Sequence, residues 1–125
     1  MEQMIDKILI GDYVIAEVKT DECFINKLQD GLDLIGNVYY DGVDRLIMYQ
    51  HQITPDFFVL KNKLAGEILQ KFSNYRIKLA IVGQFPELIG QSKSLRDFIF
   101  ESNKGNLVGF VGSKQEAIEF LTRKK

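Results

Sequence analysis

The residues of this chain best suited to chemistry are its one cysteine and its one histidine, Cys23 and His51. Each follows an apolar run typical of a β-strand, and open α/β sheets carry functional loops at the carboxyl ends of their parallel strands. A thiol in the first turn of a helix can ionise and act as a nucleophile, with an imidazole as its base. The alternative is an inert cysteine that faces the core, because Phe24 and Ile25 follow it directly.

Two hydroxyl side chains, Thr54 and Ser94, stand at predicted helix starts. Exposed N–H groups and positive charge at a helix N-terminus suit anion binding or phosphorylation. Lys93 and Arg96 would add positive charge beside Ser94, whereas Asp97 would oppose it. The alternative role of both hydroxyls is that of an ordinary N-cap.

Several function classes are disfavoured by composition. One histidine, one cysteine and scattered carboxylates make no metal-ligand set, and Walker-type and dinucleotide glycine motifs are missing, so we expect no metal and no cofactor. A net charge of −1 argues against nucleic-acid binding, and no apolar run approaches the roughly 20 residues that span a membrane. Segment 1–6 is acidic and unlike a signal peptide, which predicts a cytoplasmic location.

Short apolar runs alternate with amphipathic stretches and predict five strands. They cover residues 8–10, 13–16, 46–49, 76–82 and 107–111. Gly11-Asp12 separates the first two and suits a type II′ hairpin, so these two strands should pair antiparallel. The fourth run is almost wholly apolar after Lys78, which is typical of a strand buried on both faces.

Four helices are predicted between and after the later strands. The first begins near Glu22, with Thr20 or Asp21 as its cap, and the second begins at Thr54 and Pro55 and runs to about residue 75. Segment 84–91 is the longest predicted loop. Ser92 or Ser94 caps the third helix, which ends at residues 103–105, and a Ser113–Glu116 capping box opens the fourth.

The resulting order is β-β-α-β-α-β-α-β-α. It predicts an α/β fold in a single domain over residues 1–125, with an N-terminal β-hairpin followed by α-β-α-β-α-β-α and a mostly parallel sheet. If sequential strands lie side by side, right-handed crossovers place the helices on one sheet face. The apolar fourth strand then needs another cover, which the hairpin, a terminal helix or the second subunit of a homodimer could supply.

Two sequence blocks carry a family resemblance. The first is Thr54-Pro55-Asp56-Phe57-Phe58, continued by LAGEILQKFSNYR at 64–76, and the second is KSLRDFI at 93–99 with ESNKG at 101–105. They resemble the bacterial domain-of-unknown-function family 4180 over nearly the whole chain. The resemblance implies a family membership and no particular activity.

The element order is also similar to that of STAS domains, the anti-sigma-factor-antagonist type of interaction module. In STAS domains a phosphorylatable Ser or Thr stands at the start of the helix after the third strand. Thr54 has the corresponding place here, although Pro55-Asp56 follows it where that family has an Asp-Ser-x-Gly-like sequence. The resemblance therefore implies a regulatory module with a protein partner.

Two functions follow from these observations as hypotheses. The preferred one is a non-enzymatic regulatory or interaction module with a STAS-like fold. Its partner surface would lie on the Thr54–Phe58 turn and on the helix at 93–103. The residues singled out on that surface are Asp56, Phe57, Phe58, Asp97 and Asn103. For Phe57 and Phe58, core packing is the alternative role.

The second hypothesis is a small enzyme or small-molecule-binding protein that uses the loops at the strand carboxyl ends. Its candidate residues are Cys23, His51, Asp56 and Lys93. The two hypotheses differ in whether the thiol reacts as an activated nucleophile.

Overall fold

The structure of the protein is a computed structural model that describes residues 5–123. Most of the acidic segment 1–6, on which the predicted location rests, lies outside the described residues. Across residues 5–123, no helix has both the length and the apolar character that crossing a membrane would require.

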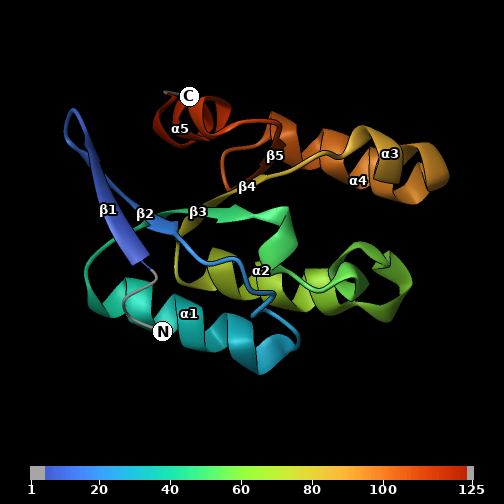
Figure 1. Cartoon of the computed structure of the whole chain (residues 1–125), viewed down its shortest axis with the longest axis horizontal. Coiled ribbons are helices and arrows are strands. Elements are labelled where there is room, and N and C mark those ends of the chain that lie inside the picture. Colours follow the sequence, from blue (N-terminus) through green and yellow to red (C-terminus); the bar gives the residue numbers. More distant parts are fainter. Residues whose placement is uncertain (1–4, 124–125) are drawn as a thin grey trace.

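A five-stranded sheet forms the middle of the molecule, and its strands lie in sequence order (Figure 1). The strands are β1 (Ile5–Ile10), β2 (Tyr13–Val18), β3 (Arg45–Tyr49), β4 (Lys78–Val82) and β5 (Val108–Val111). β1 pairs antiparallel with β2, and every later pair is parallel. This confirms the predicted α/β fold with an N-terminal hairpin and a mostly parallel sheet, including the codirectional neighbours β3 and β4.

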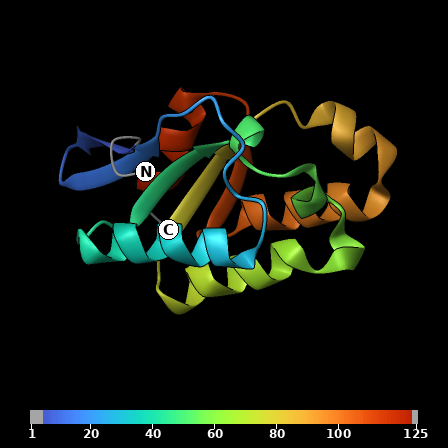
Figure 2. The same cartoon turned by 60° about the horizontal axis from the view of Figure 1, so that its bottom comes forward.

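Helices cover both faces of this sheet. They are α1 (Leu28–Tyr40), α2 (Leu64–Asn74), α3 (Pro86–Gln91), α4 (Lys93–Lys104) and α5 (Lys114–Thr122). Figure 2 shows α1, α2 and α4 along one side of the strands and α5 on the other. The larger core cluster joins the sheet to α1, α2 and α4, and a smaller cluster joins it to α5.

The terminal helix is therefore what covers the second face of β4. Ala80 on β4 and Ile47 on β3 are fully buried against Ala117 and Leu121 of α5. Gly109 on β5 allows this close approach, because a Cβ there would lie 2.8 Å from the ring of Phe120. Of the three predicted covers, the terminal helix is the one present, and no second subunit is needed over this part of the sheet.

The hairpin turn agrees with its predicted chemistry. Gly11 has a φ of +59°, which the first central position of a type II′ turn requires and which glycine adopts without steric penalty. The register of the hairpin runs from the Ile10–Tyr13 pair to the Ile5–Val18 pair.

The predicted start of the first helix was wrong. α1 begins at Leu28, and residues 21–27 form an irregular segment in which Ile25 makes a parallel bridge to Ile53. The amides of Phe24 and Ile25 both donate to the carbonyl of Gln52, at 2.9 and 3.0 Å. The amides of Phe24 and Ile25 therefore make long-range bonds in place of the local bonds of a helix. The bridge to Ile53 lets Ile25 enter the core, and this tertiary packing outweighs the helix propensity of the segment.

The predicted second helix is divided into three parts. Thr54 caps a short 3-10 helix, η3 (Pro55–Phe58), and a second 3-10 helix, η4 (Leu60–Asn62), precedes α2. Lys63, between η4 and α2, has a φ of +69°, which an α-helix cannot contain. The predicted apolar face at residues 64–72 is nevertheless present, because Ile68 and Phe72 of α2 are buried.

Two smaller boundaries also differ from expectation. β4 begins at Lys78 rather than at residue 76, because Arg76 has a φ of +56° and lies in a turn. Segment 84–91 contains the short helix α3 instead of a loop, with Pro86 at its first position. The predicted caps of the last two helices are confirmed, since the Ser92 and Ser113 hydroxyls accept from the amides of Leu95 and Glu116.

Candidate functional site

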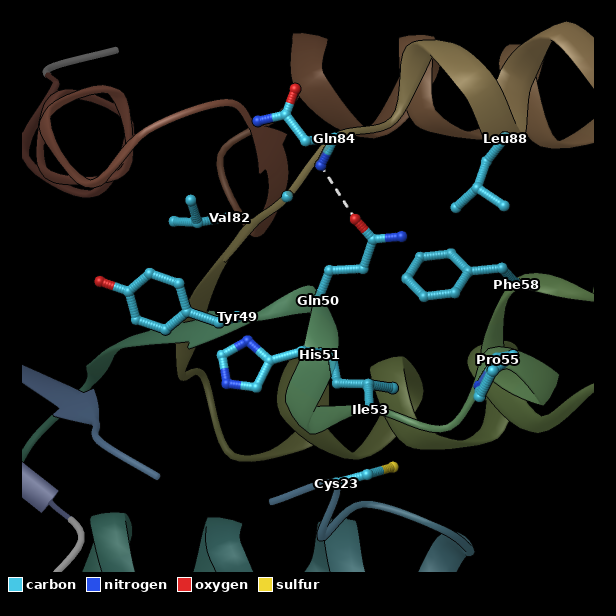
Figure 3. Close-up of a pocket in the computed structure, with 11 residues that line it drawn as sticks. Cys23, Tyr49, Gln50, His51, Ile53, Pro55, Phe58, Val82, Gln84 and Leu88 are labelled. Carbon is cyan, nitrogen blue, oxygen red and sulfur yellow. Dashed lines mark hydrogen bonds between the residues drawn. The ribbon is translucent and has the colours of Figure 1, made fainter. Parts of the chain in front are cut away.

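A pocket of about 640 Å³ lies where β3 and β4 end (Figure 3). Its wall is mostly apolar with a few polar side chains. The lining residues are Cys23, Tyr49, Gln50, His51, Ile53, Pro55, Phe58, Val82, Gly83, Gln84 and Leu88. The position matches the carboxyl edge at which open α/β sheets bind ligands, and the volume lies in the range usual for small organic molecules.

The 3-10 helix η2 (Gln50–Gln52) shapes the floor of this pocket. Gln52 is only 1% exposed, and its side chain joins two strand ends. Its Oε1 accepts from the Tyr49 amide at 2.9 Å, and its Nε2 donates to the carbonyls of Val18 and Thr20 at 3.0 and 3.2 Å. This buried amide holds the end of β3 against the end of β2.

The imidazole of His51 has a defined orientation. Its Nε2 lies 2.9 Å from the Thr20 carbonyl oxygen, and because a carbonyl only accepts, Nε2 must carry the hydrogen. In the neutral ring Nδ1 is therefore a hydrogen-bond acceptor. The ring lies beside Tyr49, with centroids 6.1 Å apart (Figure 3).

Gln50 supplies a hydrogen-bond donor beside the acceptor of His51. Its Oε1 accepts from the Gln84 amide at 2.9 Å, which leaves the Nε2 hydrogens for another partner. Figure 3 shows this side chain between the two strand ends, with its amide nitrogen directed toward Phe58 and Leu88. Gly83 makes room for it, because a Cβ at Gly83 would lie 2.3 Å from Gln50 Oε1.

A buried carboxylate, that of Glu17, holds the hydroxyl end of the Tyr49 side chain, and Glu17 itself does not line the pocket. Glu17 on β2 is 3% exposed, accepts from Tyr49 Oη at 2.5 Å and pairs with Lys114 Nζ at 3.0 Å. Burial raises the pKa of Glu17, but the bonds from Tyr49 and Lys114 and the charges of Lys114 and Lys19 together lower it below its ordinary value. Burial and the bond to Glu17 raise the pKa of Tyr49 above its ordinary value, so the phenol stays protonated.

Cys23 and His51 line the same pocket, but no hydrogen bond joins them among residues 5–123. Cys23 is exposed and lies before α1 rather than in its first turn, and its Sγ is 3.5 Å from Asn26 Oδ1. The helix N-terminus on which the prediction of an activated nucleophile depended is therefore missing at this position. The predicted nucleophile and base are brought to one pocket without being coupled.

The turn that contains Thr54 lies at the rim of the pocket. Thr54 is half-buried, and its hydroxyl accepts from the Asp56 amide at 3.4 Å, while the Asp56 side chain is exposed. Phe57 and Phe58 are 2% and 7% exposed, and both belong to the large core cluster. Only Phe58 also lines the pocket, so these rings serve mainly as core and the exposed part of the turn is Pro55-Asp56.

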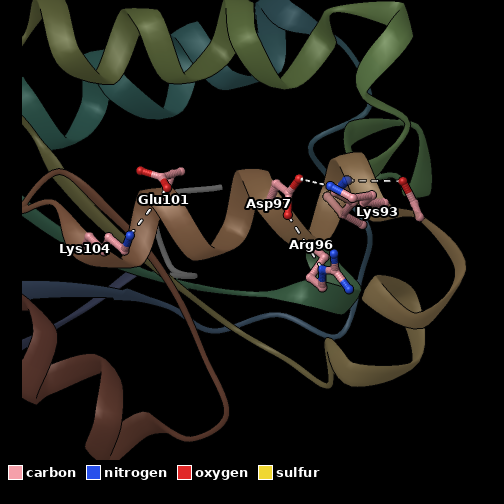
Figure 4. A network of polar contacts seen from close by, with 7 residues as sticks. Lys93, Arg96, Asp97, Glu101 and Lys104 are labelled. Carbon is pink, nitrogen blue, oxygen red and sulfur yellow. Dashed lines mark hydrogen bonds and ion pairs between the residues drawn. The ribbon is translucent and has the colours of Figure 1, made fainter.

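The cations beside Ser94 are directed at a neighbouring carboxylate (Figure 4). Lys93 Nζ lies 3.0 Å from Asp97 Oδ2, and Arg96 Nε lies 3.6 Å from Asp97 Oδ1. The bond from Lys93, together with the charges of Lys93 and Arg96, lowers the pKa of the Asp97 carboxyl below its usual value. Asp97 thus offsets the positive charge that an anion site at Ser94 would use.

A groove of about 700 Å³ continues from the pocket along α3 toward the start of α4. It shares Pro55, Phe58 and Leu88 with the pocket and extends to Ser94 and Leu95. The Thr54 turn and the N-terminal part of α4, predicted as one surface, therefore meet along this groove. Asn103, which was predicted on the same surface, does not line this groove. Its side chain instead bonds to the backbone of Phe110 on β5.

Sequence reasoning missed the polar residues that build this site, namely Glu17, Tyr49, Gln50 and Gln52. Their signals were weak but present. Three polar residues, 50–52, directly follow a buried strand, and Gly83 directly follows another, a position where glycine often permits a close approach. Glu17 is the one charged residue inside an otherwise apolar strand core.

Comparison with known proteins places the chain without describing an activity. No curated protein and no solved structure matches it. The model of one family, described as domain of unknown function DUF4180, matches residues 11–121. This match covers both sequence blocks that carried the resemblance, together with β2 to β5 and every helix that surrounds the pocket. The chain therefore belongs to the DUF4180 family.

Proposed function

We propose that the protein is a non-enzymatic binding module that receives a small, neutral, planar molecule in the pocket at the carboxyl edge of the sheet. The observation that carries the proposal is the pairing of a donor and an acceptor on an apolar wall: Gln50 Nε2 and His51 Nδ1. A few placed polar groups on a mainly apolar surface are the usual design of a small-molecule site.

The chemistry of the wall defines the ligand class. Phe58, Leu88 and the ring of Tyr49 favour a flat apolar body. His51 Nδ1 would accept from an N–H of the ligand, and Gln50 Nε2 would donate to a carbonyl or ring nitrogen. Cyclic amides and purine-like rings have this combination of groups. A binding role is favoured over catalysis because Cys23 and His51 each bond elsewhere.

Titration of the protein with 2-quinolone, followed by protein NMR, tests the proposal. We expect shifts of the amides of residues 50–53 and 83–85, and much weaker shifts with naphthalene, which has the same flat body without polar groups. The absence of shifts in these segments at millimolar 2-quinolone, with adenine and nicotinamide also silent, would contradict the proposal.

Two variants isolate the polar pair. Gln50→Glu keeps the acceptor for the Gln84 amide and removes the donor. His51→Phe keeps an aromatic ring and removes Nδ1, together with the Nε2 bond to the Thr20 carbonyl. Each should weaken binding of 2-quinolone by about fivefold, since a lost hydrogen bond is worth about 1 kcal/mol. Gln91→Ala, in the groove outside the pocket, serves as the matched control and should leave the affinity unchanged.

A regulatory or protein-interaction role is the second candidate, and the groove favours it. The groove joins the rim turn after Thr54 to the start of α4, the two parts of the predicted partner surface. A STAS-like switch would place a phosphate on Thr54, whose hydroxyl accepts a hydrogen bond from the Asp56 amide in this structure. A bacterial source and a cytoplasmic location stay predictions from the sequence.

The Thr54→Asp variant tests this second role against Thr54→Val. A partner isolated with the wild-type chain should bind Thr54→Asp with altered affinity, whereas Thr54→Val, which removes only the hydroxyl, should resemble the unmodified protein. Equal affinity for both variants would remove Thr54 as a switch.

A further inference from the structure

The two outer strands of the sheet differ in whether their free edge is already occupied. At β5, the Phe110 amide donates to Asn103 Oδ1 at 2.7 Å, and Asn103 Nδ2 donates to the Phe110 carbonyl at 3.1 Å. This side chain takes the place of a further strand. At β1, no backbone or side-chain partner lies along the outer edge among residues 5–123.

The register of the hairpin defines which groups of β1 face outward. A two-residue turn makes Ile10 and Tyr13 a hydrogen-bonded pair, and antiparallel ladders alternate bonded and non-bonded pairs. Ile8 therefore bonds to β2, whereas Lys7 and Leu9 direct their N–H and C=O groups away from the sheet. Leu9 is also 75% exposed, so the open edge has an apolar side chain beside its free backbone groups.

We propose that a second copy of this chain pairs with β1, antiparallel and across a two-fold axis at Ile8, to give a continuous ten-stranded sheet. Free backbone groups on an exposed edge are a template for strand addition. Within residues 5–123 the sheet has one such edge, because Asn103 occupies the outer edge of β5 at Phe110. Pairing through a single edge closes after two copies, which favours a dimer over a fibre.

The side chains of β1 select both the occupant and the register. Centring on Ile8 places Ile8 opposite its own copy, on the face where Ile8 and Ile10 are only partly covered by the α5 cluster. It also places Lys7 opposite Leu9 of the second copy, so the lysine stem covers the exposed leucine. Shifting the axis to Lys7 would place two lysines face to face, and like charges directly opposite are destabilising.

Charge substitutions at Leu9 test the proposal by sedimentation equilibrium at low salt. Leu9→Lys would introduce two lysine pairs per dimer, and Leu9→Glu two pairs of opposite charge. We expect the dimer dissociation constant to rise about tenfold with Leu9→Lys and to fall several-fold with Leu9→Glu. The double variant Lys7→Glu/Leu9→Lys should restore the affinity of the dimer.

Tyr40→Lys is the matched control, because Tyr40 is 90% exposed and lies at the end of α1 rather than on β1. It should leave the dissociation constant unchanged. A wild-type chain that stays monomeric at about 1 mM overturns the proposal, and so does an equal shift for Leu9→Lys and Leu9→Glu. A shift with Tyr40→Lys as large as that with Leu9→Lys would also overturn it, since it would point to another surface.

Discussion

The strands β1 and β5 form the two margins of the same sheet, yet only β5 is held on every side. β5 has α4 and α5 on its two faces and the Asn103 side chain along its edge. β1 is held by β2 and by partial contacts of its isoleucines with the two core clusters. Both strands contain an apolar run, residues 8–10 in β1 and 107–111 around β5, although β1 also has Asp6 and Lys7. The comparison teaches that an apolar run alone does not decide whether a margin is core or surface, because the packing of neighbouring elements also decides it.

The largest expected effect comes from shortening one apolar side chain at each margin. Phe110→Ala on β5 removes a ring that is 4% exposed and packs against Phe58, Phe85 and Phe98, so it should lower the free energy of unfolding by about 3–5 kcal/mol. Leu9→Ala on β1 should change it by less than about 0.5 kcal/mol. Urea denaturation of the two variants measures the difference, and similar losses would refute the contrast between the margins.

Removing the side chain that closes the β5 edge should have the next largest effect. Asn103→Ala leaves the amide and carbonyl of Phe110 without these partners in a partly buried place, and should cost about 2–3 kcal/mol of unfolding free energy. Asn37→Ala, on the exposed face of α1, is the control and should stay within about 0.5 kcal/mol. If Asn103→Ala also stays within that limit, the edge is not closed by this residue.

The attachment of the hairpin to the rest of the sheet should depend on pH through Glu17. Its folded-state pKa lies below the ordinary value, so its stabilising effect is fully present above about pH 4.5 and is lost as the pH falls through the folded-state pKa. Glu17→Gln should therefore lower the unfolding free energy by about 1–2 kcal/mol at neutral pH. The gap between the variant and the wild type should shrink on acidification; a gap that is constant between pH 7 and pH 3 would contradict the assigned role.

The smallest expected effect comes from a like-charge pair within the hairpin. Asp6 on β1 lies directly opposite Glu17 on β2, so Asp6→Asn should raise the unfolding free energy by about 0.5 kcal/mol. Asp12→Asn in the hairpin turn provides a control that removes the same charge away from Glu17. A gain of equal size in both variants would show that net charge, rather than this pair, is responsible.

Local sequence signals predicted much of the scaffold. Gly11-Asp12 predicted the hairpin, the Ser113–Glu116 box predicted the start of α5, and the apolar runs predicted all five strands. Each of these rests on contacts within a few residues, where turn chemistry and helix caps act. The position of Cys23 and His51 at the carboxyl edge also followed from the strand order.

Long-range bonds account for what the sequence did not predict. Segment 21–27 leaves its helical pattern because Ile25 pairs with Ile53, more than twenty residues away. Gln52 and Glu17 became structural centres of the site because their partners come from other strands and from α5. A side chain's partners across the sheet are not encoded in the spacing of its neighbours.

The sequence by itself determined the order of the five strands, the antiparallel hairpin and the parallel arrangement that follows it, because hydrophobic period, turn residues and capping residues act locally. The tertiary structure alone decided which face α5 covers, how Tyr49, Gln50 and His51 come together in one pocket, and which margin stays open. Those outcomes depend on the packing of segments distant in the chain, since burial and hydrogen-bond satisfaction are settled only when all neighbours are in place.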